Sequence, residues 1–247
     1  MIVLYRLLAF AVFLLLWWAA ARLAGTNLIP TPAATLAAAR EMFGDGRIWR
    51  ATAESLAVYG GGYLLAVLVG IPTGLFMGGY RVLGRTLEIY VNALTATPRV
   101  AFIPLIIVLL GLGYEAKVAI IFLGAVMPVI INTYAGVLNA DGELVEMARS
   151  AGASRAQIFR RILLPGALPF IVVGLRLGAT IGLINTVVAE LYTAVRGLGG
   201  LLAIYGNTFQ MAPYFVVVLV LATIGTLVTQ ALRLIEARTE RWRYQGG

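Results

Sequence analysis

The stretch VEMARSAGASRAQIFRRILLPGALP, residues 145–169, interrupts a strongly apolar chain with four arginines and a glutamate. Long apolar segments precede and follow it. Its residues are mostly good helix formers, and Gly152 supplies a turn, so the pattern predicts two short helices joined at that glycine. We expect such a polar insert to lie at the surface of an apolar protein body.

The composition decides the class of protein. Of 247 residues, 61% are hydrophobic and 12% are charged, which is far from the composition of a water-soluble domain. The chain has no cysteine and no histidine, so we expect no disulfide, redox chemistry or metal site. Its net charge of +8 is explained by basic residues in the loops that flank membrane spans, and it does not indicate that the chain binds nucleic acid. These features predict an integral membrane protein embedded in a lipid bilayer.

Apolar segments of about 20 residues can span a bilayer as helices. Six candidates lie at residues 7–23, 57–79, 100–112, 118–138, 167–189 and 214–234. The third is short and lies among Pro98 and Pro104, which favours a bent or partly re-entrant segment. We therefore predict an all-α integral membrane protein with about six transmembrane helices.

Basic residues orient these helices, because cytoplasmic loops are enriched in Lys and Arg. The predicted organisation is a first helix with an extracytoplasmic loop over residues 1–50, a transmembrane domain over residues 51–235 and a cytoplasmic tail over residues 236–247. Both termini, residues 80–99 and the loop 141–165 are assigned to the cytoplasm. That side carries Arg6, Arg81, Arg85, Arg99, Arg149, Arg155, Arg160, Arg161, Arg233, Arg238, Arg241 and Arg243.

The first helix has an alternative interpretation as a secretory signal, since Arg6 precedes an apolar run that ends in small residues at positions 19–21. Residues 2–21 are long enough to span, and Trp17 and Trp18 suit the aromatic belt at a membrane interface. We therefore expect residues 1–21 to be retained.

Two predicted spans carry glycine at every fourth residue. This spacing places each set on one helical face, where the missing side chains let another backbone approach closely. We predict that both faces are helix-packing seams, with a lining of the solute pathway as the alternative. The glycines are Gly70, Gly74 and Gly78 in the second span and Gly174, Gly178 and Gly182 in the fifth.

The loop 141–165 has helix signals at two places. Asp141 and Glu143 suit the acidic first turn of one helix, and Ser154 can cap a second. The pattern predicts a cytoplasmic helix-turn-helix lying across the membrane surface. An amphipathic hairpin held by anionic lipids is the alternative.

This loop resembles the signature of ATP-binding-cassette (ABC) importer permeases, which is written E-A-A, three residues, G, nine residues, I-x-L-P. Only Met147 departs from that pattern. The segments LIPTP from Leu28, TPRVAFIPL from Thr97 and VVAELY from Val187 are similar to the subfamily that serves nitrate, sulfonate and taurine importers. The matching positions of the loop are Glu146, Ala148, Gly152, Ile162, Leu164 and Pro165.

The resemblance implies a type I ABC importer permease fold in a bacterial inner membrane. It implies a pathway between two permease copies, here a homodimer, together with two cytoplasmic ATP-binding subunits and an extracytoplasmic substrate-binding protein. The helix near residues 146–152 would be the coupling helix seated on the ATPase. The residues implied in coupling are Glu146, Ala148, Gly152, Ala153, Phe159, Ile162, Leu164 and Pro165.

Hydrolysis is not expected on this chain, because its sequence lacks the phosphate loop G-x-x-x-x-G-K-[ST]. ATP and Mg would bind to the partner ATPase, and the permease would not be an enzyme. A secondary transporter is the alternative, although ionisable residues deep in the spans are few, with Arg176 the clearest. A membrane-embedded enzyme would need a nucleophile or an acid–base pair, and neither is evident.

Candidates for the solute pathway lie in and beside the fifth predicted span, where unpaired polar groups would be costly in hydrocarbon. Interhelical hydrogen bonding is the alternative role for them. The sequence leaves the solute open among small anions such as nitrate, sulfonates or taurine, and vitamin precursors. The candidates are Thr180, Asn185 and Thr186, with Glu190 near the outer end of the span.

Overall fold

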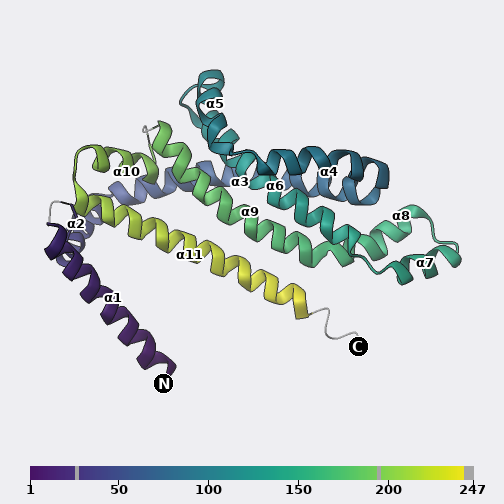
Figure 1. Cartoon of the computed structure of the whole chain (residues 1–247), viewed down its shortest axis with the longest axis horizontal. Coiled ribbons are helices and arrows are strands. Elements are labelled where there is room, and N and C mark those ends of the chain that lie inside the picture. The colour runs from purple at the N-terminus through teal and green to yellow at the C-terminus, as the bar shows by residue number, and fades with distance from the viewer. Residues whose placement is uncertain (26–27, 194–195, 242–247) are drawn as a thin grey trace. The chain divides into compact units, whose positions relative to one another are not determined.

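The computed structural model of the chain describes residues 1–25, 28–193 and 196–241. All regular secondary structure in these ranges is helical. Figure 1 labels the α-helices. The elements are α1 (Ile2–Ala24), α2 (Pro32–Gly44), α3 (Arg47–Gly79), α4 (Arg81–Ala96), the 3₁₀ turn η1 (Arg99–Phe102), α5 (Ile103–Leu110), α6 (Tyr114–Leu138), α7 (Gly142–Ser150), α8 (Arg155–Ile158), the π turn η2 (Phe159–Leu163), α9 (Leu164–Thr193), α10 (Leu198–Asn207) and α11 (Met211–Arg241).

Within the described residues, five helical segments are long and apolar enough to cross a membrane: Ile2–Ala24, Arg47–Gly79, Tyr114–Leu138, Arg155–Thr193 and Met211–Leu234. A sixth span is formed if the pair Val82–Ala96 and Arg99–Leu110 is counted as one, and this pair is bent by 84° at its break. The all-α fold and the bend of the third span are therefore confirmed.

The prediction that residues 80–99 form a loop is wrong, because most of this segment is α4. The charged residues of this segment lower its average hydrophobicity, so the sequence did not indicate that one face of the helix is apolar. Leu87 and Val91, one helical turn apart, pack against a buried cluster that includes Met77 and Met127. The span predicted at residues 100–112 is only the second half of the bent pair.

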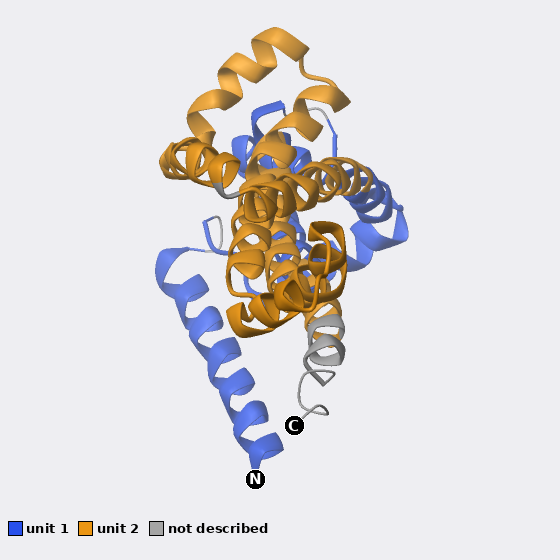
Figure 2. Cartoon of the chain, turned by 90° about the vertical axis from the view of Figure 1, so that its right-hand side faces the viewer, with its two compact units in different colours: residues 1–56, 190–224 blue, residues 57–189, 225–247 orange. Residues whose placement is uncertain are grey.

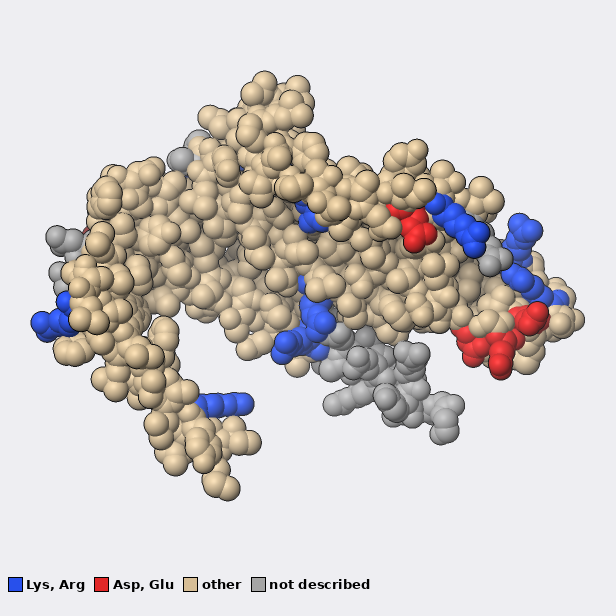
Figure 3. All heavy atoms as spheres, in the orientation of Figure 1, with Lys and Arg blue, Asp and Glu red and all other residues tan. Residues whose placement is uncertain are grey.

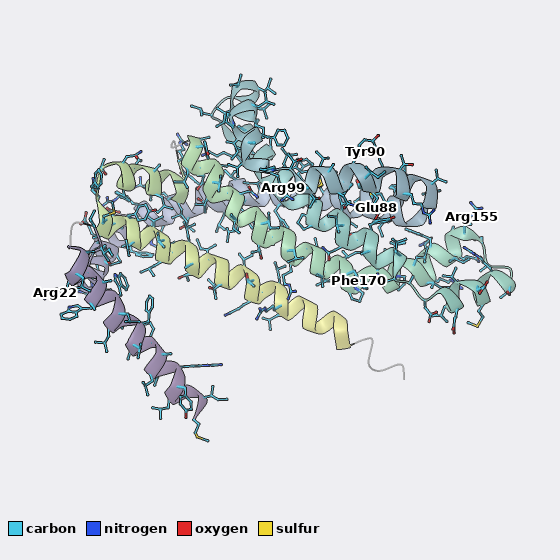
Figure 4. The ribbon with its side chains drawn as sticks, in the orientation of Figure 1. Arg22, Glu88, Tyr90, Arg99, Arg155 and Phe170 are labelled. Atoms are coloured by element: carbon cyan, nitrogen blue, oxygen red, sulfur yellow. The ribbon has the colours of Figure 1, made fainter. Side chains whose placement is uncertain are left out.

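Arg99, also assigned to a loop, lies at the break of this pair. Its Nη1 donates a hydrogen bond to the carbonyl oxygen of Gly124 over 3.2 Å. Gly124 lies well inside α6, about 15 Å from the first residue of that helix and about 21 Å from its last. Arg99 therefore lies beside the middle of an apolar helix (Figure 4).

The chain divides into two compact units, which Figure 2 colours separately. Unit 1 comprises residues 1–56 and 190–224, and unit 2 comprises residues 57–189 and 225–247. Unit 1 thus holds α1, α2 and α10 with one end each of α3, α9 and α11. Unit 2 holds α4 to α8 and the remainder of those three helices.

In unit 1, Trp17 joins α1 to two other segments. Its Nε1 donates to the carbonyl oxygen of Pro30 over 2.9 Å, and its ring stacks on Phe215 of α11 with centroids 5.8 Å apart. Thr31 follows at the N-cap of α2, where its hydroxyl accepts from the amide of Ala34. The retention of residues 1–21 stays a prediction.

Arg47, at the start of α3, contacts the acidic end of α2. Its guanidinium lies 2.7 Å from Glu41 and 2.5 Å from Asp45, and it donates to the hydroxyl of Tyr205 on α10 over 3.1 Å. The backbone amide of Arg47 also donates to Asp45, and this hydrogen bond is the main cause that lowers the pKa of Asp45. The ends of α2, α3 and α10 are thereby joined.

In unit 2, α6 is the central helix, and half of its apolar window is buried. Both glycine rows lie against it. A Cβ atom at Gly74 of α3 would lie 2.6 Å from Cβ of Thr133, and one at Gly178 of α9 would lie 2.9 Å from the carbonyl oxygen of Ala125. Gly70 and Gly78 similarly face Val129 and Val137, while Gly174 faces Asn132 and Gly182 faces Ala125 and Tyr59.

Two stacked tyrosines join α3 directly to α9. The rings of Tyr59 and Tyr63 lie parallel with centroids 5.7 Å apart. Their hydroxyls donate to the carbonyl oxygens of Ala179, over 3.2 Å, and Leu175, over 2.9 Å. Lipid tails offer no hydrogen-bond partner to these hydroxyls. The two hydrogen bonds therefore stabilise the packing of α3 against α9 in addition to the close approach of both helices to α6.

We expect Gly74→Leu and Gly178→Leu each to lower the free energy of unfolding by about 1–3 kcal/mol or more, because the added side chains meet backbone and Cβ atoms of α6. The measurements are membrane yield and thermal unfolding of the purified protein. Gly60→Leu is the matched control on α3, since nothing lies within 4 Å of a Cβ at Gly60. Equal stability of all three variants would contradict the packing described here.

Candidate functional site

The loop 141–165 is formed by two capped helices and the glycine between them. Asp141 caps α7, where its Oδ1 accepts from the amides of Glu143 and Leu144 over 2.9 and 3.3 Å. Ser154 caps α8 in a capping box, in which Ser154 and Gln157 each accept from the other's backbone amide. Gly152 lies between them with φ +80°, which only glycine adopts readily. The predicted helix-turn-helix and the cap at Ser154 are confirmed.

Helix α7 presents charged and apolar side chains to its surroundings. None of its residues is buried, and Leu144 and Met147 are 45% and 63% exposed. Glu146 is exposed and Ala148 is half-buried. Figure 3 shows acidic side chains gathered next to basic ones at the end of unit 2 that carries α7 and α8, with few charges on the visible surface of its other helices. Helix α7 therefore offers a short amphipathic surface.

A π turn makes the second half of the loop continuous with α9. The turn η2 holds Phe159 and Ile162, and Leu164 and Pro165 follow in the first turn of α9. Phe159 lies 3.5 Å from the position of a Cβ at Gly79, the last residue of α3. A displacement of α8 would therefore act directly on the ends of α3 and α9.

The same end of the loop is anchored in an apolar cluster. Val137 of α6 and Ala167 and Ile171 of α9 are buried there. Leu163 and Leu164 from the loop pack against them, together with Ile71, Leu75 and Leu175. The loop is thus attached to α3, α6 and α9, while α7 remains outside this packing.

The polar candidates in α9 bond back to their own helix. The hydroxyls of Thr180 and Thr186 donate to the carbonyl oxygens of Arg176, over 3.1 Å, and Gly182, over 2.9 Å. Asn185 does the same through Nδ2 to Ile181 over 2.9 Å. Thr180 is exposed, Thr186 is buried, and Asn185 is half-buried beside Gly124 of α6. Thr180 and Asn185 therefore lie in different surroundings, the first exposed and the second packed against α6.

Glu190, the fourth candidate, is a buried carboxylate in unit 1, only 1% exposed. The hydroxyl of Ser55 donates to its two oxygens over 2.9 and 2.8 Å, and the amide of Gly199 donates over 2.8 Å. Ser55 in turn accepts from the amide of Leu198 over 2.8 Å. Glu190 therefore satisfies the N-terminus of α10, where a negative charge is favoured.

Two neighbours complete this arrangement. Glu54 accepts from the amide of Gly197 over 3.0 Å. Gly197 has φ +91°, and a Cβ there would collide with the carboxylate of Glu190. Sequence reasoning missed Ser55 as the partner of Glu190, because the two residues lie 135 positions apart in the chain. Gly197 is the N-cap residue of α10, and its position directly before that helix is the sequence feature that could have identified it.

No metal-binding group of three Asp, Glu, His or Cys side chains occurs in the residues that the structure describes.

Comparison with known proteins identifies the class. Residues 70–241 match the family of binding-protein-dependent transport system inner membrane components. The chain is 33% identical to the taurine transport system permease protein TauC of Escherichia coli over 239 residues, covering 94% of this chain and 87% of that protein. It is 34% identical to the putative aliphatic sulfonates transport permease protein SsuC of E. coli, covering 88% and 82%.

A solved chain of the MetNI methionine ABC transporter in an inward-facing conformation has the same fold. The TM-score is 0.66 at 23% identity, covering 75% of this chain and 93% of that one. The chain therefore belongs to the binding-protein-dependent permease family and has the type I ABC importer fold. It is the permease subunit of an ABC importer, a multi-pass membrane protein that works with ATPase and binding-protein partners, and the secondary-transporter alternative is not favoured.

We expect Ser55→Ala to lower the free energy of unfolding by about 1–3 kcal/mol, because Glu190 and the amide of Leu198 both lose a buried hydrogen-bond partner. Thermal unfolding of the purified protein measures this loss. Thr208→Ala is the control, since its exposed hydroxyl bonds only within α10, and its change should stay within about 0.5 kcal/mol. Equal effects of the two substitutions would show that the Glu190 network adds no stability.

Proposed function

We propose that this chain forms, with a second copy of itself, the pathway of an importer for small sulfonate- or taurine-type anions. The support for the solute class is that two relatives are the taurine permease TauC and the putative aliphatic sulfonates permease SsuC. Nitrate and vitamin precursors, which the sequence also left open, are the alternative solutes. An extracytoplasmic binding protein would deliver the solute to the outer ends of the spans.

The loop 141–165 is proposed as the point where ATP hydrolysis acts on the permease. The observation that carries this proposal is that α7 has no buried residue although Leu144 and Met147 are apolar. An exposed apolar pair flanked by carboxylates suits a groove on another protein better than free solvent. Two ATP-binding subunits would hold ATP and Mg and receive one α7 from each permease copy.

The connection from α7 inward suits such a transfer of movement. Gly152 is the turn between α7 and α8, and the π turn joins α8 to α9 without a break. Phe159 and Leu164 then contact α3 and the apolar cluster at Val137. Among the coupling residues proposed here, Glu146, Ala148 and Ala153 would contact or support the docked helix. Phe159, Ile162, Leu164 and Pro165 would transmit its movement.

The proposed orientation in the bacterial inner membrane places both termini and the loop in the cytoplasm. Its support is the excess of arginine in these segments, which persists when Arg99 is removed from the count. On this orientation Glu190 and α10 lie near the extracytoplasmic ends of the spans. That location suits contact with a binding protein.

Co-expression of two differently tagged copies tests the homodimer. We expect each tag to recover the other in the purified complex, because a closed two-fold pair supplies two equivalent coupling helices. An unrelated tagged membrane protein expressed at the same level is the control. Recovery of a different second permease in equal amount, with no mixed-tag pair, would contradict the homodimer.

Two substitutions test the coupling role of the loop, with solute uptake and ATP hydrolysis measured together in proteoliposomes. Gly152→Val keeps every charge but costs about 1–3 kcal/mol at a positive φ, although nothing lies within 4 Å of the added Cβ. Glu146→Arg reverses an exposed charge on α7. We expect both variants to reach the membrane and to lose uptake and the stimulation of hydrolysis by loaded binding protein.

Gly142→Ala is the matched control for the glycine substitution. Gly142 lies at the start of α7 in an open position, without the positive φ of Gly152, so this variant should transport like the wild type. If Gly152→Val and Glu146→Arg also transport like the wild type, α7 is not the coupling helix. The lipid-hairpin interpretation would then take its place.

A further inference from the structure

Arg99 occupies an unusual position for a cation in this chain. It begins η1 directly after Pro98, at the break where α4 and α5 bend by 84°. A broken helix at membrane depth frees backbone groups, so it is tolerated where protein or a water-filled cavity covers it. In many secondary transporters, interrupted helices form the substrate and ion sites, and the same freed backbone groups exist at this break.

The guanidinium of Arg99 is only partly satisfied within the chain. One hydrogen bond joins its Nη1 to the carbonyl oxygen of Gly124 over 3.2 Å. Its Nε is buried and has no hydrogen-bond partner among the residues that the structure describes. Because guanidinium carries five N–H donors in a planar fork, donors remain for another group.

The neighbouring acidic residue is engaged elsewhere. Glu88 lies on α4, eleven residues before Arg99 and on the other side of the 84° bend. Its carboxylate accepts from the hydroxyl of Tyr134 on α6 over 3.3 Å. Figure 4 shows Glu88 on α4 at a distance from Arg99 along the same segment. Glu88 therefore does not neutralise Arg99.

Gly124 brings a second polar side chain to the same place. Asn185 of α9 packs against this glycine so closely that a Cβ at Gly124 would collide with its amide. Arg99 binds the carbonyl oxygen of the same residue. A cation and an amide from two different segments thus both approach Gly124, the cation at its carbonyl oxygen and the amide at its Cα side, near the middle of α6.

We propose that Arg99, at the break of the third span and bonded to Gly124, the residue against which Asn185 also packs, is an anion-binding residue of the translocation pathway. It binds the sulfonate group of the passing solute. The planar fork of arginine matches the oxygens of an oxyanion and keeps its charge at every physiological pH. This inference rests on the solute class of the proposed function.

The test uses the complete transporter, with its ATPase and binding protein, in proteoliposomes. Uptake of radiolabelled taurine and ethanesulfonate and stimulated ATP hydrolysis are measured in the same vesicles. The variants are Arg99→Gln, which keeps an N–H donor but removes the charge, and Arg99→Lys, which keeps the charge. Arg85→Gln, on the exposed part of α4, is the control for the loss of one cation.

We expect Arg99→Gln to lower the uptake rate at least tenfold while stimulated hydrolysis stays within twofold of the wild type. Arg99→Lys should keep at least a third of the uptake, and Arg85→Gln should match the wild type. Wild-type uptake by Arg99→Gln overturns the assignment. Equal loss of uptake and hydrolysis in both Arg99 variants also overturns it, because that result marks a structural role at Gly124.

The proposed function fails in a different way. If the wild-type transporter takes up neither taurine nor ethanesulfonate, the solute class is wrong and the assignment of Arg99 to a sulfonate falls with it. If the wild type takes up either probe and Arg99→Gln does so equally, the proposed function stands and only the assignment of Arg99 is lost.

Discussion

The close approach of α3 and α9 to α6 is the constraint on which unit 2 depends. In a bilayer, two apolar helices gain little hydrophobic free energy from meeting, because lipid tails are as apolar as their side chains. Dispersion contacts at short range and interhelical hydrogen bonds remain, and both require backbones to come close. Glycine at every fourth residue permits this at Gly74 and Gly178, and the hydroxyls of Tyr59 and Tyr63 bond across the resulting interface.

The loop 141–165 is built onto the ends of the same three helices. Leu163 and Leu164 enter the apolar cluster at Val137, and Phe159 contacts the end of α3 at Gly79. Because protein interiors are closely packed and resist compression, the proposed movement of α8 would reach these helix ends. Helix α7, in contrast, is not packed against these helices. Asp141 caps its N-terminus, and its apolar residues Leu144 and Met147 are exposed. The contrast separates a rigid attachment from a free docking surface.

The two charged residues singled out in the spans differ in how far the chain satisfies them. Glu190 receives hydrogen bonds from Ser55 and Gly199 and holds the N-terminus of α10. A buried charge that is matched in this way acts as a structural anchor. Arg99 has one hydrogen bond to a backbone carbonyl and a buried Nε without a hydrogen-bond partner among the described residues. This contrast is the reason why we propose a binding role for Arg99 and a structural role for Glu190.

The sequence by itself determined the features that depend on local chemistry. Hydrophobic length predicted the membrane class and most of the spans, Pro98 predicted the bend of the third, and Asp141, Gly152 and Ser154 predicted the helix-turn-helix. Only the tertiary structure decided that α4 is a helix, since the apolar partners of Leu87 and Val91 lie on α3 and α6. It also decided the depth of Arg99 and the partners of Glu190. These depend on residues distant in the chain, whose meeting is set by helix packing and by no local pattern.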